Sequence, residues 1–324
     1  MLSPSPCLRP VEGGKRKIPA RAKPGRGRPT DRNGRVRAKN RRGKMNRTKT
    51  FTEDEIKKLE PAEKIGLLAT MNSEGIPHIS LITSIQPLSA DKLVFGEFSN
   101  GLSKWHVRNN PKTAFLMMTM DKALWRGKAI WKERKKEGPE YIMYNEKPMF
   151  RYNTYFGINT VHYLDLVECG GKESLPLIKI IASVLLTRLS GSVEKKNSAD
   201  PLNALSLSFF NRMDSLKFIA YADKDGFPEI IPVIQCRAAS TETVVFSPAA
   251  YSGEMKKIPE GAEVAVFAMT LDMESVLVRG KFSGYKRSRF ITRGAVEIDW
   301  VYNSMPPVHG QIYPPVPLNP VEEF

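Results

Sequence analysis

The chain has 324 residues, of which 41% are hydrophobic and 26% charged, and a formal net charge of +16. This length indicates two domains, each large enough to bury its own core. Residues 1–44 hold 15 lysines and arginines against two acidic residues, so they carry +13 and leave +3 for the other 280 residues. The charge therefore does not mark the body of the chain as a basic nucleic-acid-binding domain.

The first 44 residues are rich in Pro, Gly and Arg and contain few large apolar side chains, so we expect a disordered tail. One interpretation is an arm for phosphate backbones or acidic membranes. The favoured alternative is a passive tail or a non-native segment, because Met45 opens an ordinary-looking start. Residues 1–44 contain no apolar stretch of the kind that a secretory signal has.

The region after the tail contains one segment twice. Residues 66–121 align with residues 217–272 at a constant offset of 151 and without a gap. A period this long indicates a duplicated domain rather than a repeat array. Eleven pairs are identical: Ala69/Ala220, Gly75/Gly226, Pro77/Pro228, Ile79/Ile230, Ser89/Ser240, Val94/Val245, Phe95/Phe246, Ala114/Ala265, Met118/Met269, Thr119/Thr270 and Asp121/Asp272.

Short apolar and alternating runs separated by turn residues predict strands in both copies, and thus a mainly β fold built from antiparallel barrels or sandwiches. Three helices are expected beside them. The first covers 51–60 with Thr52 as N-cap. The second covers 174–189, begins at Ser174 and packs between the barrels, and the third opens the second copy near 201–213.

Beyond the aligned segment, a two-residue slip matches Arg126-Gly127-Lys128 to Arg279-Gly280-Lys281, and Asp165 then aligns with Asp299. The first copy has an aromatic-rich insert at about 132–157. Two roles stay open for it: capping a planar ligand, or packing against the neighbouring barrel. Its aromatic residues are Tyr141, Tyr144, Phe150, Tyr152, Tyr155 and Phe156.

We expect five parts along the chain. They are a tail (1–44), a first domain (45–189), a linker (190–201), a second domain (202–304) and a Pro-rich arm (305–324).

Familiar catalytic signatures are missing from the sequence. It contains no G-x-S-x-G, H-E-x-x-H, Walker or G-x-G-x-x-G motif. The three cysteines and four histidines lack ligand spacing, so we expect no disulfide framework and no metal site, and we interpret the histidines as structural or surface residues. The longest apolar run is too short to cross a bilayer, which predicts a cytoplasmic protein without a membrane partner. Any chemistry would then come from a bound cofactor.

One stretch fits a cofactor phosphate. Ser103 and Lys104 follow the strand LVFGEF and precede a predicted short helix. A hydroxyl and an ammonium beside a helix N-terminus suit a phosphate, and we expect Lys104 to be exposed there. Taken alone, the pair favours a solvated loop lysine over a phosphate site.

The order GIPHISLITS…LVFGEFSNGLSKWHVRNNPKTAFLM…RGKA resembles the FMN-binding split barrel of the pyridoxamine 5′-phosphate oxidase superfamily. The resemblance covers about 62–170 well and 214–302 more faintly. It implies two tandem split β-barrels that form an intramolecular pseudo-dimer, with FMN at their interface.

The resemblance also implies roles for individual residues. Ser103 and Lys104 fall on the phosphate element, and Lys122 falls near a position that reaches the flavin ring. Gly96 and Glu97 fall where the family contacts the phosphate or ribityl chain. The strand that lines the flavin corresponds to Ser80, Leu81, Ile82 and Thr83.

The chain also departs from that family. The oxidases carry an arginine and a lysine near the places of Ser80 and Ile85, so we do not expect pyridoxamine 5′-phosphate oxidase activity. In the second copy, Glu254 and Met255 stand at the places of Ser103 and Lys104. This favours a lost phosphate site over the alternative that Lys256 and Lys257 replace the pair after a one-residue shift. Two further residues, Trp300 and Tyr302, either present aromatic surface across the interface or belong to the core.

The sequence thus predicts an FMN-dependent oxidoreductase with a small-molecule electron donor, such as a reduced nicotinamide, and a small acceptor. Alternatives are a non-catalytic flavin-binding or storage protein, and a haem- or deazaflavin-binding split barrel. Nucleic acid would be bound only through the tail. Whether two chains pair into a homodimer stays open.

Overall fold

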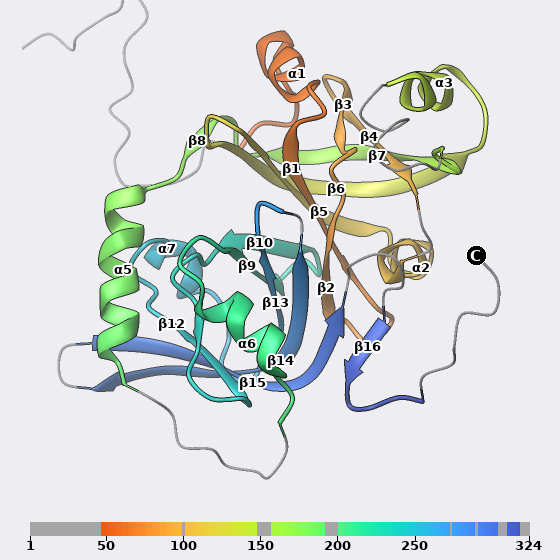
Figure 1. Cartoon of the computed structure of the whole chain (residues 1–324). Coiled ribbons are helices and arrows are strands. Elements are labelled where there is room, and N and C mark those ends of the chain that lie inside the picture. The colour runs from red at the N-terminus through yellow and green to blue at the C-terminus, as the bar shows by residue number, and fades with distance from the viewer. Residues whose placement is uncertain are drawn as a thin grey trace, which may run out of the picture. The chain divides into compact units, whose positions relative to one another are not determined.

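A computed structural model shows that the chain folds into two antiparallel sheets with the same strand order (Figure 1). The structure describes residues 47–98, 101–147, 157–191, 200–272, 274–288, 291–303 and 310–317. The predicted tail, most of the linker and four of the six insert aromatics lie outside them. All the described residues belong to one compact unit, Met45–Phe324.

The described part of the first copy contains three helices beside its strands. The elements are α1 (Glu53–Leu59), β1 (Lys64–Met71), β2 (Pro77–Leu81), β3 (Gln86–Ser89), β4 (Lys92–Glu97), α2 (Leu102–Asn109), β5 (Lys112–Thr119), β6 (Ala123–Lys135), α3 (Pro139–Glu146), β7 (Thr160–Cys169) and β8 (Glu173–Ser174).

The helix α5 (Leu177–Leu189) leads into the second copy. The elements there are α6 (Ala204–Asn211), β9 (Leu216–Ala222), β10 (Pro228–Pro232), β11 (Arg237–Ala238), β12 (Thr243–Phe246), α7 (Ser252–Met255), β13 (Glu263–Met269), β14 (Ser275–Ser288), β15 (Ile291–Asn303) and β16 (Gly310–Tyr313). The last strand, within the predicted arm, pairs with β15.

The two sheets repeat one topology. The first runs β2-β1-β5-β6-β7-β4-β3 and the second β10-β9-β13-β14-β15-β12-β11. Each strand of one copy thus has its counterpart at the same place in the other. The predicted mainly β fold of two tandem split barrels is confirmed.

Local sequence signals explain several of these elements. Thr52 caps α1 as predicted, in a capping box with Glu55. In the turn after β1, the Asn72 side chain accepts from two backbone N–H groups, and Gly75 has a φ of 80°. The same turn in the second copy uses Asp223 and Gly226, whose φ is 73°. Glycine suits both turns because other residues rarely adopt a positive φ.

The predicted helix at 174–189 differs from the structure in its start and in its packing. Ser174 pairs with Ala123 in β8, so the helix begins only after Pro176. Instead of packing between the barrels, α5 contacts β12 and β15 of the second copy (Figure 1). None of the helices in the described part of the chain combines the length and apolar character needed to cross a membrane.

The strand registers correct the predicted two-residue slip. Ala114 pairs with Lys128, and its counterpart Ala265 pairs with Arg279. The offset of 151 therefore continues, and Lys128, rather than Arg126, is the counterpart of Arg279. The shared letters Arg-Gly-Lys were misleading because the register is fixed by the alternation of the whole strand.

The expected match of Asp165 with Asp299 changes for the same reason. Val94 pairs with Tyr163, and its counterpart Val245 pairs with Ala295. This register places Glu297, not Asp299, at the position of Asp165.

The described part of the aromatic insert takes neither of its two expected roles. It extends β6 and forms α3, and Tyr144 is fully buried against its own barrel. The Tyr144 hydroxyl donates to the carbonyl oxygens of Ser84 and Val94 at 2.7 and 3.2 Å. This part of the insert therefore closes the first barrel.

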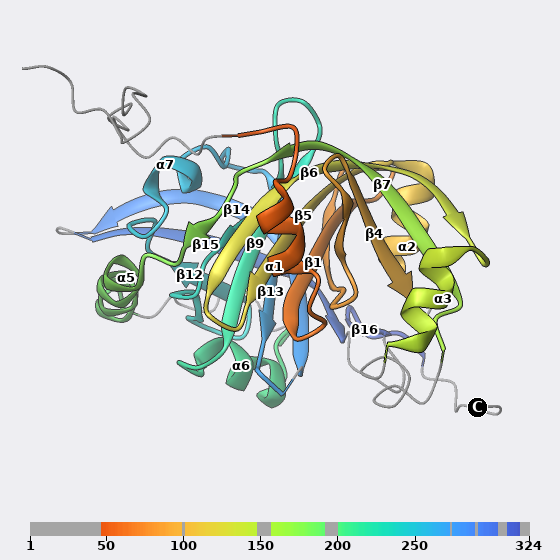
Figure 2. The ribbon, with the colours of Figure 1, turned by 90° about the horizontal axis from the view of Figure 1, so that it is seen from above.

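Strands of the two sheets lie against each other (Figure 2), and their side chains bury a shared apolar cluster between the copies. Strands β2 and β10 contact the opposite copy's β13 and β5, respectively. Six counterpart pairs meet in this cluster: Leu67/Phe218, Ala69/Ala220, Ile79/Ile230, Ala114/Ala265, Leu116/Phe267 and Met118/Met269. Four of the eleven identical pairs are among them. The repeat is therefore preserved where the copies pack together.

The inter-copy cluster should contribute strongly to stability. We expect Phe267→Ala to lower the free energy of unfolding by about 3–5 kcal/mol, because it leaves a cavity in a fully buried cluster. The measurement is urea unfolding followed by far-UV circular dichroism. The control is Leu271→Ala, on a side chain that is 69% exposed. Equal losses in the two variants would contradict this role.

Candidate functional site

The topology creates two equivalent regions between the copies. Edge strand β2 contacts β13 and β14, and its counterpart β10 contacts β5 and β6. His78 on β2 and Glu229 on β10 are counterparts at the offset of 151. We call the region around each residue the His78 site and the Glu229 site.

The His78 site centres on a buried arginine from the second copy. Arg279 on β14 donates to His78 Nδ1 at 2.8 Å, and its guanidinium carbon lies 4.1 Å from the centroid of the Trp300 ring. A guanidinium can only donate, so His78 Nδ1 accepts and a neutral His78 carries its proton on Nε2. Burial lowers the pKa of Arg279 to about 10, while Asp299 and Tyr302 oppose the shift.

A second histidine joins this group from α2. The His106 ring centroid lies 5.3 Å from that of His78, and its Nδ1 lies 3.1 Å from Thr70 Oγ1. Burial, followed by the charge of Arg279, lowers the pKa of His106 to about 4. Trp300 and Tyr302 stack on each other and face His78 across the interface. Tyr302 also belongs to the buried inter-copy cluster and Trp300 packs against it, so both expected roles apply.

The N-terminus of α2 carries unsatisfied polar groups. Its N-cap, Gly101, provides no side-chain hydrogen bond to the helix. Ser103 is 1% exposed, and its hydroxyl has no hydrogen-bond partner among the described residues. Such a buried group is costly unless something binds it. The side chain of Ser103 lies one turn before His106, on the same face of α2.

Lys104 turns back toward this helix end. Its Nζ lies 3.5 Å from the position that a Cβ on Gly101 would occupy. The lysine is only 7% exposed, which corrects the expectation of an exposed side chain. Burial lowers its pKa, and the nearby Glu97 opposes the shift. The predicted turn at Ser103 and Lys104 is instead the first turn of the helix.

Glu97 is held by a buried hydrogen-bond chain. Its carboxylate lies 2.8 Å from His162 Nε2, and Trp131 Nε1 donates to His162 Nδ1 at 3.0 Å. An indole N–H only donates, so a neutral His162 carries its proton on Nε2 and donates it to Glu97. Burial is the largest single influence and would raise the pKa of Glu97, but the His162 hydrogen bond and nearby positive charge, including that of Lys104, together lower it. Glu97 is therefore a carboxylate at neutral pH.

The four predicted residues at 80–83 do not share one environment. Ser80 follows His78 on the same face of β2 and is half-buried. Leu81 packs against the inter-copy cluster. Ile82 belongs to the core of the first barrel, and Thr83 lies in the turn after β2.

Two other predicted residues lie apart from the His78 site. Gly96 is enclosed in the first barrel, where Ser84 bridges its N–H and carbonyl and Ile158 packs on its Cα. Lys122 is exposed in the β5–β6 turn. That turn follows the end of β5 opposite to α2, about 25 Å along the strand.

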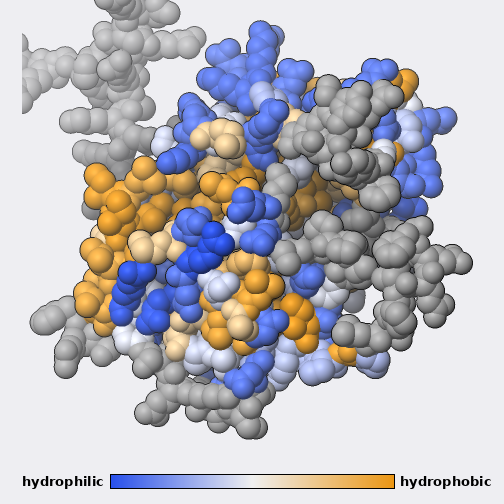
Figure 3. Space-filling model, in the orientation of Figure 1, coloured by the Kyte–Doolittle hydropathy of each residue, from blue (hydrophilic) through white to orange (hydrophobic). Residues whose placement is uncertain are grey.

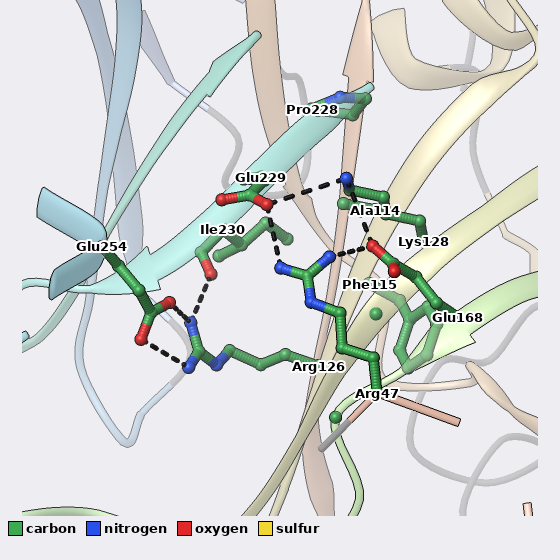
Figure 4. A pocket seen from close by; sticks show the side chains of 12 residues that line it. Arg47, Ala114, Phe115, Arg126, Lys128, Glu168, Pro228, Glu229, Ile230 and Glu254 are labelled. Carbon is green, nitrogen blue, oxygen red and sulfur yellow. Dashed lines mark hydrogen bonds and ion pairs between the residues drawn. The ribbon is translucent and has the colours of Figure 1, made fainter. Parts of the chain in front are cut away.

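The Glu229 site has the same framework but is filled with ion pairs (Figure 4). Arg126 donates to both carboxylate oxygens of Glu254 at 2.8 and 3.3 Å, and to Glu173 at 2.8 Å. Burial disfavours the charge of Arg126, but these two carboxylates outweigh it and raise its pKa. Glu254, the counterpart of Ser103, therefore binds a cation within the protein.

The rest of the Glu229 site is also paired. Lys128 forms ion pairs with Asp223 and with Glu168, the latter at 3.2 Å. Arg47 bridges Glu168 and Glu229. The space among these residues is about 20 Å³, room for about one water molecule. We conclude that this site is closed by its own side chains.

The two sites therefore differ in charge balance. Lys128 has carboxylate partners, whereas its counterpart Arg279 forms no ion pair with any described residue. No local sequence pattern indicates that Arg279 meets His78, because the two residues lie 201 positions apart in the chain. The sequence feature that could have indicated the difference between the two sites is the change from His78 in the first copy to Glu229 in the otherwise similar second copy.

Comparisons with known proteins found similar solved structures at low sequence identity. No family model and no curated protein matches the chain. Group A Streptococcus HupZ is 15% identical, with 37% of this chain and 91% of that chain covered and a TM-score of 0.31. An FMN-binding protein from Syntrophomonas wolfei is 17% identical, with coverages of 38% and 86% and a TM-score of 0.33.

A third solved structure is a putative pyridoxamine 5′-phosphate oxidase from Lactobacillus delbrueckii. It is 19% identical, with coverages of 38% and 94% and a TM-score of 0.30. Each of these three structures covers a little more than a third of this chain. The chain is a tandem split-barrel protein.

The described residues contain no set of side chains that matches the ligands of a metal site. In the described ranges, no three His, Cys, Asp or Glu residues come together as a metal ion would need.

The Arg126–Glu254 pair should stabilise the closed Glu229 site. We expect Glu254→Gln to lower the free energy of unfolding by about 2 kcal/mol, because it removes a charge partner from buried Arg126. Glu263→Gln, in the exposed pair with Lys281, should change it by less than about 0.5 kcal/mol. Both are measured by urea unfolding at neutral pH. A Glu254→Gln variant as stable as the parent would show that Glu173 alone compensates Arg126.

His106 should make the fold acid-sensitive. Its pKa of about 4 lies below the ordinary 6.5, so the unfolded chain binds the proton first as the pH falls. This part of the stability is present above pH 6.5 and is lost toward pH 4. Between about pH 7 and 5 the loss is on the order of 2 kcal/mol.

The measurement is the free energy of unfolding at both pH values, in the parent and in His106→Gln. The variant should lose less stability than the parent over this interval. Identical losses would mean that His106 does not titrate as the structure indicates.

Proposed function

We propose that the chain binds one flavin of the FMN class at the His78 site, with the flavin phosphate at the N-terminus of α2. The observation that carries this proposal is the buried, unpartnered Ser103 hydroxyl beside the Lys104 ammonium at an uncapped helix end. A phosphate supplies the acceptor oxygens that the Ser103 hydroxyl lacks among the described residues, and negative charge that suits the Lys104 ammonium. The resemblance of the sequence to FMN-binding split barrels supports the choice of ligand.

In this proposal, the backbone N–H groups of the first α2 turn and the Ser103 hydroxyl donate to the phosphate, and Lys104 balances its charge. The ring system of the flavin lies toward the second copy, against Trp300 and Tyr302. Arg279 faces the same space as a donor and also hydrogen-bonds to His78. Ser80 and Leu81 line the β2 side.

Other predicted contacts receive less support from their positions. Ile82 and Gly96 are enclosed by their own barrel, and Thr83 lies in the turn after β2. Lys122 is exposed at a distant turn. Glu97 lies near Lys104 and would order that lysine rather than touch the phosphate, because two anions repel. These five contacts stay predictions.

We further propose that the chain is a cytoplasmic oxidoreductase. A bound flavin supplies two-electron redox chemistry, which the described side chains do not provide themselves. The chain's residues would bind and orient the cofactor and exclude water from it. A small donor such as a reduced nicotinamide, and a small acceptor, would reach the flavin in turn.

The experiment that tests the cofactor is the absorption spectrum and mass of the small molecule that co-purifies with the chain. We expect a flavin at a ratio near one per chain, because ion pairs close the Glu229 site. A Soret band would instead indicate haem. A ratio near two would reject the closed second site.

A storage protein is separated from a reductase by adding NADH without oxygen. Bleaching of the flavin band would support the reductase, and an unchanged band over many minutes would support storage.

A lysine variant tests the phosphate position. We expect Lys104→Met to weaken FMN binding by about 10–100-fold, since it removes a charge-assisted hydrogen bond while keeping the side-chain volume. Lys217→Met is the matched control, because it replaces another buried lysine outside the site. Binding is measured by titrating the apoprotein and following flavin fluorescence. Equal affinities in the two variants would reject Lys104 as a phosphate ligand.

A further inference from the structure

An exposed apolar stripe on α5 has no role in either inter-copy site. Its side chains are strongly exposed: Leu177 (50%), Ile178 (86%), Ile181 (62%), Leu185 (57%) and Leu189 (72%). At 100° per residue, four of them lie within about 80° of one another around the helix. Figure 3 shows this apolar surface over α5, on the left of the molecule.

The opposite face of α5 is partly polar, which reverses the usual pattern of a surface helix. Ser183 and Thr187 are buried against the second copy, together with Ile180. The Thr187 hydroxyl accepts from the Ser247 backbone N–H at 2.9 Å and donates to the Ser183 carbonyl at 2.7 Å. The helix is therefore anchored by hydrogen bonds in an orientation that leaves its aliphatic side chains in solvent.

The charges around the stripe are basic. Lys179 and Arg188 are the only charged residues of α5, and both are exposed. Beyond the helix end, Arg237 donates to the Gly191 carbonyl at 2.6 Å, and Arg293 donates to that of Ser190 at 2.9 Å.

The neighbouring β14–β15 hairpin extends this basic character. Lys286 pairs with Arg293, and Arg287 follows it, so both lie near the end of α5. Both side chains are exposed. Apolar side chains bordered by cations match the interface of a bilayer with anionic headgroups.

Two other occupants fit less well. The segment that follows α5, residues 192–199, is polar and offers only Val193 as a large apolar side chain. A second copy of the chain could pair α5 with α5, but a helix about 20 Å long covers only a few hundred Å², below the roughly 800 Å² per partner of a stable interface. An antiparallel pair would also bring Lys179 toward Arg188 of the other chain.

We propose that α5 is a docking surface for an anionic phospholipid bilayer, with the helix lying parallel to the membrane plane. The aliphatic stripe enters the headgroup boundary, and the surrounding basic side chains contact lipid phosphates. Residues 1–44, with a net charge of +13, add a second attraction to the same surface. Stable peripheral binding generally needs two such signals. This proposal does not depend on the flavin.

The test is co-sedimentation of the full chain with vesicles of phosphatidylcholine alone or mixed with phosphatidylglycerol. We expect binding to the mixed vesicles and little to the neutral ones. The double variant Ile178→Gln/Leu185→Gln should bind the mixed vesicles at least about tenfold more weakly than the parent, because it removes apolar area that would be buried. Both side chains are exposed, so the fold should persist, as checked by circular dichroism.

The matched control is Ile142→Gln/Met213→Gln, on side chains 54% and 67% exposed elsewhere. It should bind like the parent. The series is repeated at about 0.5 M salt, where the Debye length is about 4 Å and the attraction between the tail and the vesicles is suppressed. Under these conditions the α5 variant should lose a larger share of the parent's vesicle binding.

Two outcomes would overturn the proposal. If the α5 variant binds mixed vesicles as tightly as the parent, α5 does not dock. If the parent binds no vesicles, and sedimentation velocity shows a dimer that the α5 variant converts to monomers, a second copy covers the stripe instead.

Discussion

The packing of two sheet faces against each other is the constraint on which the rest of this structure depends. Counterpart side chains such as Ala69 and Ala220 meet in one apolar cluster between the copies. That contact sets edge strands β2 and β10 against the opposite sheet. Both inter-copy sites exist because of this arrangement, since each joins an edge strand of one copy to the neighbouring strands of the other.

The Glu229 site and the His78 site share the same strand framework but differ in their charged side chains. At the Glu229 site, buried cations meet carboxylates, and Arg126 and Glu254 neutralise each other. At the His78 site, buried Arg279 meets a neutral imidazole and an indole face. The first arrangement is complete without a ligand, whereas the second retains positive charge and a buried hydroxyl that an anionic ligand would satisfy.

The sequence predicted what local and repeating patterns determine. Thr52 as a helix cap and the duplicated strands both follow from residues read in order. Ser174 was misplaced because strand pairing overrode a capping preference. The Arg-Gly-Lys match was misplaced because three identical residues do not determine the pairing register of the strands. The His78–Arg279 contact joins residues 201 positions apart, and no local pattern encodes such a contact.

Joining both copies in one chain has a consequence for how the His78 site responds to dilution. In a protein assembled from separate subunits, a site between them disappears when the subunits dissociate. Here the linker keeps the partner at a fixed effective concentration, so Arg279 stays available to His78 however scarce the protein is. The occupancy of such a site would depend on the supply of its ligand alone, and not on the abundance of the chain.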